Sequence, residues 1–272
     1  MARCVVVLAD GLRPDAVTRT HMPTLRALGA DYTRAISANT VRPSVTVAAL
    51  ASFATGVSPA AHGLVEPGLG FLTRLSALRP LARELGRHRI STLVAAGAPA
   101  IRSRPVACAL TACAGVDRLV LSEGGARGIV EGSVPHLDNH EFAFIYLPDC
   151  DRAGHSNGWM SPTYLKAASH VDAAIASLAI RLDSSLLIVL ADHGGGGVYP
   201  TDHDAPHPIN DHIPLVLAGR GVRHGHTITG DVSLLDIPPT ILRWFDVPVP
   251  LNYEGRALQE AFETPVPEGA AA

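Results

Sequence analysis

The chain has 272 residues, of which 47% are hydrophobic and 17% charged, and its formal net charge is −3. This composition excludes extended disorder, and the length allows a substantial buried core. No apolar run approaches the roughly 20 residues of a membrane span. The lack of a basic surplus argues against a nucleic-acid polymer as a partner. We expect one domain over residues 1–263, followed by a disordered tail at 264–272.

The apolar residues 4–9 predict a first strand that ends at Asp10. A secretion signal is the alternative for this stretch, but its apolar core is short and no small-residue cleavage site comes after it. We therefore expect a cytoplasmic protein. The cysteines show no CxxC spacing and are expected to remain reduced thiols: Cys4, Cys108, Cys113 and Cys150.

Strand and helix patterns alternate along the rest of the chain. Further strands are expected at residues 33–37, 90–96, 142–147, 186–191 and 213–219. Helices with serine, proline or glycine near their ends are expected at residues 22–29, 43–56, 79–85, 161–182 and 233–242. Residues 97–140 show only short apolar runs and are expected to be irregular. This alternation predicts an α/β fold, a three-layer α/β/α sandwich with a mainly parallel central sheet.

The strand expected at 186–191 is followed by Asp192, His193 and four glycines, Gly194 to Gly197. An unbroken apolar run of this kind is typical of a strand buried on both faces of a parallel sheet. Ligands of such sheets bind just beyond the carboxyl ends of the strands. We interpret the glycines as leaving the backbone free to turn and letting a ligand approach closely. Alone, the pair could also be a turn cap beside an exposed histidine.

Carboxylates and imidazoles also follow other expected strands. The first strand ends at Asp10, the strand at 142–147 precedes further such groups, and two histidines lie in the loop before residue 213. This mixture of oxygen and nitrogen ligands suits zinc, with manganese or magnesium as alternatives. The set exceeds what one tetrahedral ion can use, so two divalent ions are expected. The candidate ligands are Asp10, Asp151, His155, Asp192, His193 and either His203 or His207.

Thr46 is the candidate nucleophile. It falls in the first turn of the helix expected at 43–56, where free backbone N–H groups and the positive helix end favour an anion. Two metal ions about 4 Å apart stabilise the entering and leaving oxygens of an in-line displacement at phosphorus. The sequence therefore indicates hydrolysis of a phosphate ester.

Four blocks in order carry a resemblance to a known family. They are residues 7–11; Thr46 through Thr55-Gly56 to Pro59 and His62-Gly63; residues 151–155; and Asp192-His193-Gly194, and the segment 236–240 also matches. On these blocks the chain resembles the alkaline phosphatase superfamily, and most of all its nucleotide pyrophosphatase/phosphodiesterase branch. The chain is short for this superfamily, so a large cap is not expected.

The resemblance implies two metal sites. One is formed by Asp10, Thr46, Asp192 and His193, and the other by Asp151, His155 and a later histidine, for which His203 is preferred over His207. It also implies a ping-pong hydrolysis of a small-molecule phosphomonoester, phosphodiester or phosphonate, nucleotides included, through a phosphorylated Thr46.

One position departs from the branch, which has an asparagine shortly after its His-Gly pair. This chain has Pro67 there, and proline offers no donor. Arg102, Arg104 or a backbone N–H would have to replace it, or the substrate differs.

Several other functions compete with hydrolysis. A sulfatase is disfavoured, because its modified cysteine and Cys-x-Pro-Ser-Arg signature are absent at Thr46. A phosphomutase of the same superfamily and an inactive metal-binding protein stay open. A nicotinamide-binding protein is discounted, since the glycine run lacks the GxGxxG spacing before a helix.

Overall fold

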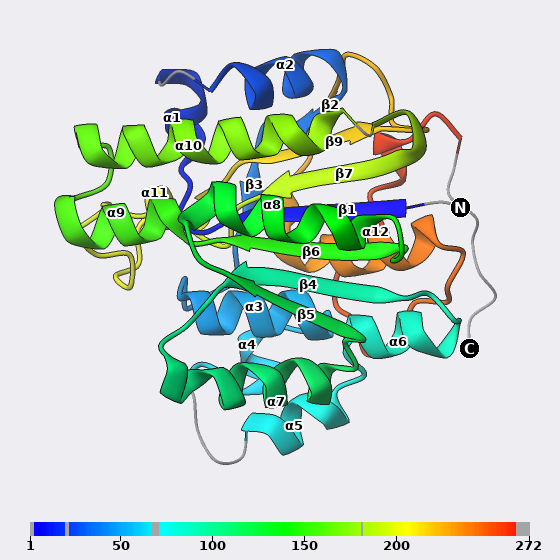
Figure 1. Ribbon diagram of the computed structural model, residues 1–272. Helices are drawn as coiled ribbons and strands as arrows, with labels where there is room; N and C mark the ends of the chain where they lie inside the picture. Colours follow the sequence, from blue (N-terminus) through cyan, green and yellow to red (C-terminus); the bar gives the residue numbers. More distant parts are fainter. Residues whose placement is uncertain (1–2, 20–21, 67–70, 181, 265–272) are drawn as a thin grey trace.

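An eight-stranded sheet crosses the molecule and carries helices on both faces (Figure 1). The computed structural model describes residues 3–19, 22–66, 71–180 and 182–264. Its strands follow the order β10-β2-β9-β7-β1-β6-β4-β5. Neighbours are parallel except that β9 runs antiparallel to both β7 and β2. The expected α/β sandwich with a mainly parallel sheet is therefore confirmed.

The centre of the sheet is formed by three parallel strands. β1 (Arg3–Ala9) lies between β6 (Phe142–Leu147) and β7 (Ser185–Leu190). Every residue of β7 is buried, as the unbroken apolar run predicts for a strand covered on both faces. All three strands end at the left edge of the sheet in Figure 1, beside α9. The residues that come after them are thereby brought to one place.

Shorter strands extend the sheet on both sides and form a second sheet. The outer strands are β4 (Thr92–Gly97), β5 (Arg118–Ser122), β9 (Leu215–Gly219), β2 (Thr33–Ala35) and β10 (His226–Ile228). A separate three-stranded sheet has the order β11-β3-β8 and consists of β3 (Ala38–Asn39), β8 (His212–Ile213) and β11 (Val232–Ser233).

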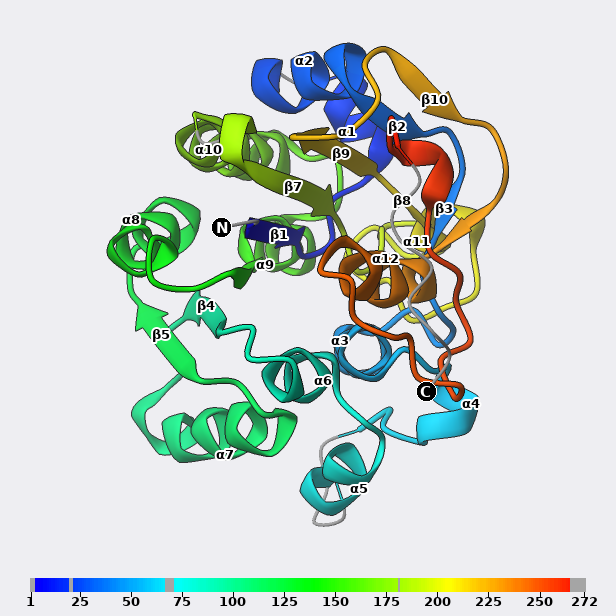
Figure 2. The ribbon, with the colours of Figure 1, turned by 90° about the vertical axis from the view of Figure 1, so that its right-hand side faces the viewer.

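Two helical layers cover the large sheet, as the view along the central strands shows (Figure 2). One layer contains α1 (Pro14–Arg19), α2 (Pro23–Asp31), α8 (Gly125–Leu137), α9 (Asp149–Asn157) and α10 (Pro162–Ala179). The other contains α3 (Thr46–Thr55), α4 (Pro59–His62), α5 (Phe71–Ala77), α6 (Leu81–Arg87), α7 (Arg104–Ala114) and α12 (Ile237–Trp244). The short α11 (Pro208–Asp211) lies at the carboxyl edge of the central strands.

The strand expected at 213–219 is two strands in different sheets. β8 ends at Ile213 and β9 begins at Leu215, so Pro214 separates them. Proline has no N–H to donate to a strand ladder. The chain therefore leaves the small sheet at this residue and enters the large one, antiparallel to β7.

The expectation that residues 97–140 are irregular is wrong. This segment contains α7, β5 and α8, which extend the sheet and cover its face. The glycines and Pro135 in α8 hide its helical pattern in the sequence. Its glycines are needed for packing: a Cβ at Gly128 would lie 1.9 Å from the Glu123 carbonyl oxygen, and one at Gly132 would lie 2.2 Å from Ser122 Oγ. Tight packing against β5 thus overrides helix propensity.

Other expected elements differ only in their bounds. β6 matches the expected strand, and Ser161 caps α10 by accepting the Tyr164 backbone N–H at 3.2 Å. The helix expected from residue 79 begins at Leu81, and the one expected from residue 43 begins at Thr46. The short α9 was not expected, because it follows β6 after Pro148 alone.

Two sequence-based expectations concern covalent state and membrane spans. All four cysteines are free thiols, and Cys4 and Cys150 are buried. Within the described ranges, no helix has the length and apolar character needed to cross a membrane.

Gly56 ends α3 in the left-handed conformation, at a φ of 69°, and a Cβ there would lie 2.2 Å from Tyr253 Cδ2. Gly56→Ala should therefore lower the free energy of unfolding by about 2 kcal/mol, from the backbone penalty plus displacement of the ring. Denaturant titration measures this loss. Gly86→Ala is the control, because a Cβ there meets nothing within 4 Å. Equal stability of the two variants would contradict this packing of Tyr253 on Gly56.

Candidate functional site

Three carboxylates meet at the carboxyl edge of the central strands. Asp10 follows β1, Asp192 follows β7, and Asp151 lies in the first turn of α9 after β6. The Asp151 backbone N–H donates to the Asp10 carbonyl at 2.9 Å, which ties α9 to the end of β1. His155 is one turn beyond Asp151 on the same helix. The structure thus brings these residues together as the sequence predicts.

Three histidines turn the same ring atom toward these carboxylates. The Nδ1 atoms donate to backbone carbonyls: His193 to Gly194 at 2.7 Å, His155 to Thr201 at 3.0 Å, and His203 to Ser44 at 2.8 Å. Each Nε2 is left to face the site. Second bonds of this kind orient histidines that ligate metal ions in proteins.

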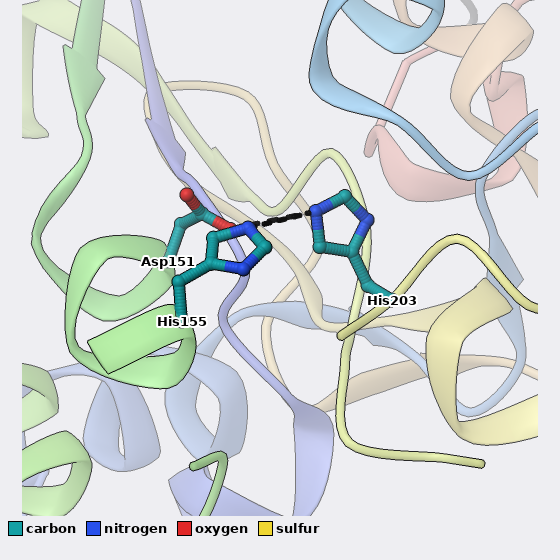
Figure 3. Close-up of side chains that lie close together, drawn as sticks. All are labelled: Asp151, His155 and His203. Atoms are coloured by element: carbon teal, nitrogen blue, oxygen red, sulfur yellow. Dashed lines mark hydrogen bonds and ion pairs between the residues drawn. The ribbon is translucent and has the colours of Figure 1, made fainter. Parts of the chain in front are cut away.

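His155 and His203 face each other, with Asp151 beside them (Figure 3). Their Nε2 atoms are 3.2 Å apart, and Asp151 Oδ1 lies 3.3 Å from the Nε2 of His155 and 3.8 Å from that of His203. Because both rings use their Nδ1 protons on carbonyls, two neutral rings would direct lone pairs at each other. A cation between them removes this conflict.

A second group surrounds the buried His193. Its Nε2 lies 3.3 Å from Asp10 Oδ1, 3.6 Å from Asp192 Oδ2 and 4.0 Å from Asp151 Oδ1. The other oxygen of Asp192 accepts the backbone N–H groups of Gly11 and His193, and the other oxygen of Asp10 accepts the Tyr146 hydroxyl. Each of these two carboxylates is therefore held by one oxygen and presents the other to the site.

The presented oxygens are buried and have no hydrogen-bond partner among the described residues: Asp10 Oδ1, Asp151 Oδ1 and Asp192 Oδ2. Buried acceptors without partners are costly and rare in proteins. Two groups have ligand atoms close enough to hold an ion, Asp151 with His155 and His203, and Asp10 with Asp151 and His193. The carboxylate and imidazole donors fit divalent cations such as zinc.

The pKa values of the candidate ligands are shifted by burial and by neighbouring charges. Burial and the nearby Asp10 charge raise the pKa of Asp151 to about 6 and that of Asp192 well above its ordinary value. Burial opposes the charged form of His193, but Asp192 and Asp10 outweigh it and raise its pKa to about 10. Burial and the charge of His193 lower the pKa of His203 to about 4. The shifts of Asp151, Asp192 and His193 reflect carboxylates crowded into a buried site, where a cation would offset their charge.

Thr46 is the first residue of α3 and lies at this site, with its Oγ1 3.1 Å from His193 Nε2. The preceding segment is attached to the loop that holds the histidines. Thr40 Oγ1 donates to the Asp192 carbonyl, and Ser44 Oγ donates to the His203 carbonyl at 3.0 Å. The hydroxyl therefore faces the carboxylates from the positive end of a helix.

The two candidate histidines of the 202–207 loop have different surroundings. His203 is 5% exposed and joins His155 and Asp151. His207 precedes α11, and its Nδ1 accepts the backbone N–H of Ile209 at 3.1 Å. His203 therefore lies with two other candidate ligands, whereas His207 makes a capping contact at α11.

The expectation that the glycine run lets a ligand approach closely is wrong. A Cβ at Gly194 would lie 2.0 Å from the Ile209 carbonyl oxygen, and one at Gly197 would lie 2.6 Å from the His207 ring. At Gly195 it would lie 2.1 Å from Trp159 Cε2. The protein itself fills the space beside these glycines.

Supporting residues were not found from the sequence. Tyr146, Ser44 and Asn210 each bond to a predicted site residue or to its backbone. Asn210 is buried, donates to the carbonyls of His203 and Ala205, and accepts the Gly197 N–H. Only Tyr146 carries a sequence signal, as a polar-tipped residue near the end of an apolar strand.

The profile of the type I phosphodiesterase/nucleotide pyrophosphatase family matches residues 4–69 and 94–235, which is most of the chain. The chain belongs to this family. The predicted relation to the alkaline phosphatase superfamily is thereby confirmed, and membership in the type I phosphodiesterase/nucleotide pyrophosphatase family supports phosphoester hydrolysis as the class of chemistry.

Solved structures share the fold at low sequence identity. Human ectonucleotide pyrophosphatase/phosphodiesterase 5 aligns with a TM-score of 0.76 and 11% identity over 96% of this chain and 100% of that one. An inactive threonine-to-alanine form of the murine protein, in complex with AMP, aligns with a TM-score of 0.75 and 14% identity over 97% and 100%. The phosphonate monoester hydrolase of Silicibacter pomeroyi aligns at 0.70 and 16% over 95% and 76%.

Curated relatives match over shorter segments. The 2,3-bisphosphoglycerate-independent phosphoglycerate mutase of Antithamnion sp. is 29% identical over 124 residues, which is 44% of this chain and 24% of that enzyme. The enzyme of the same description from Saccharophagus degradans is 33% identical over 40% of this chain and 21% of its own length. The match thus spans about a quarter of these relatives.

The candidates for replacing the family asparagine are only partly placed. Pro67 lies outside the described residues, as does the side chain of Arg102. Arg104 donates to the Pro99 carbonyl at 3.4 Å and forms an exposed ion pair with Glu123 at 3.3 Å. That arginine is therefore already engaged at the protein surface.

Addition of zinc should raise the unfolding temperature, because a cation satisfies the three partnerless carboxylate oxygens only in the folded protein. At a hundredfold excess over the dissociation constant the gain is about 2.7 kcal/mol. Thermal unfolding with and without zinc, and after chelator treatment, measures it. His207→Ala should keep the zinc-dependent shift, and His203→Ala should lose much of it. If His207→Ala lost the zinc-dependent shift and His203→Ala kept it, His207 would be the ligand.

Proposed function

We propose that this protein is a two-metal phosphodiesterase or phosphatase that hydrolyses a small-molecule phosphate ester through a phosphorylated Thr46. Family membership supplies the class of reaction. The observation that carries the rest is the cluster of three buried carboxylate oxygens without hydrogen-bond partners among the described residues and three imidazole Nε2 atoms, with the Thr46 hydroxyl 3.1 Å from His193 Nε2. Two metal ions held by such ligands stabilise the attacking and leaving oxygens of an in-line displacement, a role that suits a hydroxyl nucleophile.

Two ligand sets divide these residues. Asp10, Thr46, Asp192 and His193 would hold one divalent cation, most simply zinc. Asp151, His155 and His203 would hold the other. Ligand atoms of Asp151, His155 and His203 lie within 4.8 Å of one another, as do those of Asp10, Asp151 and His193, so Asp151 could contribute to either ion. Asp192 and Thr46 are assigned to the first ion because they lie 3.6 Å and 3.1 Å from His193 Nε2. When bound, the cations would favour the ionised Thr46 hydroxyl and stabilise charge on the entering and leaving oxygens.

The chain's own residues position the reaction. The first turn of α3 offers N–H groups to the phosphoryl oxygens, and Thr46 Oγ1 forms the new bond to phosphorus as the ester bond breaks. Water then cleaves the phosphothreonine, releases phosphate or a phosphomonoester, and restores the hydroxyl. The three Nδ1 bonds to carbonyls keep each imidazole in one tautomer and orientation throughout.

Structural neighbours support the nucleophile and the class of substrate. The murine ectonucleotide pyrophosphatase/phosphodiesterase 5 complex contains AMP and is inactive with a threonine replaced by alanine. The Silicibacter pomeroyi neighbour hydrolyses phosphonate monoesters. We therefore propose nucleotides, phosphonates and other small phosphate esters as the substrates to test first.

Thr46→Ala should abolish turnover of bis(p-nitrophenyl) phosphate, with a loss of at least about a thousandfold in kcat, because it removes the proposed attacking oxygen. Release of p-nitrophenol in the presence of zinc, manganese or magnesium measures it. Thr46→Ser keeps a hydroxyl and should retain part of the activity. Near wild-type turnover by Thr46→Ala would remove the residue from this role.

A phosphomutase is the second candidate, because the curated relatives that match part of the chain are phosphoglycerate mutases. A mutase would use the same threonine but return the phosphoryl group to a second hydroxyl. With phosphoglycerate as substrate, release of free phosphate would favour the hydrolase, and isomerised phosphoglycerate without free phosphate would favour the mutase. Zinc binding without turnover of any ester would indicate an inactive, metal-binding relative.

A further inference from the structure

A tryptophan packs against the two histidines of the group formed by Asp151, His155 and His203. Trp159 lies in the connection between α9 and α10 and is 7% exposed. Its ring meets His155 edge-on, with centroids 5.1 Å apart and an interplanar angle of 78°. It meets His203 in the same manner at 5.7 Å and 71°. One indole therefore contacts both imidazoles that face each other in Figure 3.

Hydrogen bonds also connect this indole to the group around His193. Trp159 Nε1 donates to the Gly11 carbonyl at 2.9 Å, and Tyr164 Oη donates to the same oxygen at 2.9 Å. The N–H of Gly11 in turn donates to Asp192 Oδ1 at 3.2 Å. The backbone N–H of Trp159 donates to the Pro200 carbonyl at 2.8 Å, which attaches it to the loop before His203. Trp159 is thus linked to both groups of candidate ligands.

Small residues leave room for the ring. A Cβ would lie 2.5 Å from Trp159 Cε2 at Gly154 and 2.1 Å from the same atom at Gly195. Neither glycine has a positive φ, so the backbone conformation alone does not require glycine at these positions. The requirement is steric, and it comes from the indole. This accounts for the glycine before His155 and for part of the run after His193.

We propose that Trp159 is a positioning residue that holds the rings of His155 and His203 at the separation that one cation requires. This inference rests on the proposed metal-dependent function. Each ring has a single Nδ1 bond to a carbonyl, and one such bond leaves the ring free to rotate about it. Contact with the indole edge removes that freedom. This matters most for His155, whose side chain is 46% exposed and lacks the burial that confines His203.

Trp159→Phe and Trp159→Leu test the proposal, with zinc binding measured by calorimetry on chelator-treated protein. The wild type should bind two equivalents. Trp159→Leu should bind one of them about 10-fold to 100-fold more weakly, the range for groups that support metal ligands, with the other equivalent nearly unchanged. Trp159→Phe keeps an aromatic edge without the Nε1 donor and should fall between. Wild-type affinity for both equivalents in Trp159→Leu would overturn the proposal.

The chain offers a matched control, because it contains two tryptophans. Trp244 lies in α12 and stacks on Phe262 with centroids 5.8 Å apart, away from the ligand groups. Trp244→Phe should bind zinc as the wild type does, and the emission of its single tryptophan, Trp159, should change on titration. The emission of Trp159→Phe, from Trp244 alone, should stay constant. If the emission of Trp159 stayed constant while the protein bound two zinc ions, the proposed role of Trp159 beside the zinc ligands would be contradicted.

A second variant covers the case in which the Trp159 variants fail to fold. Gly195→Ala leaves the indole in the chain but places a methyl group against it, and it should weaken the same zinc equivalent. Gly86→Ala is its control. Failure of the proposed function is distinguishable, because a wild-type protein that binds no zinc refutes the metal site itself. Normal zinc binding in folded Trp159→Leu and Gly195→Ala refutes only the role of Trp159.

Discussion

The repulsion among three carboxylates gathered at one end of a buried sheet is the constraint on which the site depends. Asp10, Asp151 and Asp192 come after three adjacent parallel strands, so the topology itself brings their charges together. Each has one buried oxygen without a hydrogen-bond partner among the described residues, and in Asp10 and Asp192 the other oxygen is committed to the protein. Such an arrangement is stable only with compensating positive charge. The same residues that make this site costly are therefore the ones whose charge a bound cation would offset.

The fold provides this arrangement through ordinary sheet packing. β1, β6 and β7 are largely buried, which fixes their register and hence the position of the residues just beyond each strand. The histidines reach the site differently, from a helix and from loops. Their positions depend on backbone carbonyls that accept from Nδ1, so the orientation of each ring is set by main-chain geometry.

Much of the fold and of the candidate site could be predicted from the sequence, because apolar runs identify the central strands and acidic residues after them identify the carboxyl edge. Asp10, Asp192 and His193 are found directly by that logic. The segment 97–140 could not be read, since the glycines of α8 signal a helix breaker while their actual cause is close packing around β5. The prediction that the glycines after His193 make room for a ligand failed for the same reason. In both places a neighbouring part of the protein, and not a ligand, occupies the space a Cβ would need. Long-range contacts of this kind have no local signature.

One link between segments far apart in the chain has a broader consequence. Ser44 and His203 exchange two hydrogen bonds, from His203 Nδ1 to the Ser44 carbonyl and from Ser44 Oγ to the His203 carbonyl. Because Ser44 lies two residues before Thr46, these hydrogen bonds hold the loop around His203 against the start of α3. Val198 and Tyr199, at the exposed tip of the same loop, take no part in these two hydrogen bonds, so substitutions there should leave them intact. The loop thus combines an exposed tip with a base that is hydrogen-bonded to the segment leading into α3.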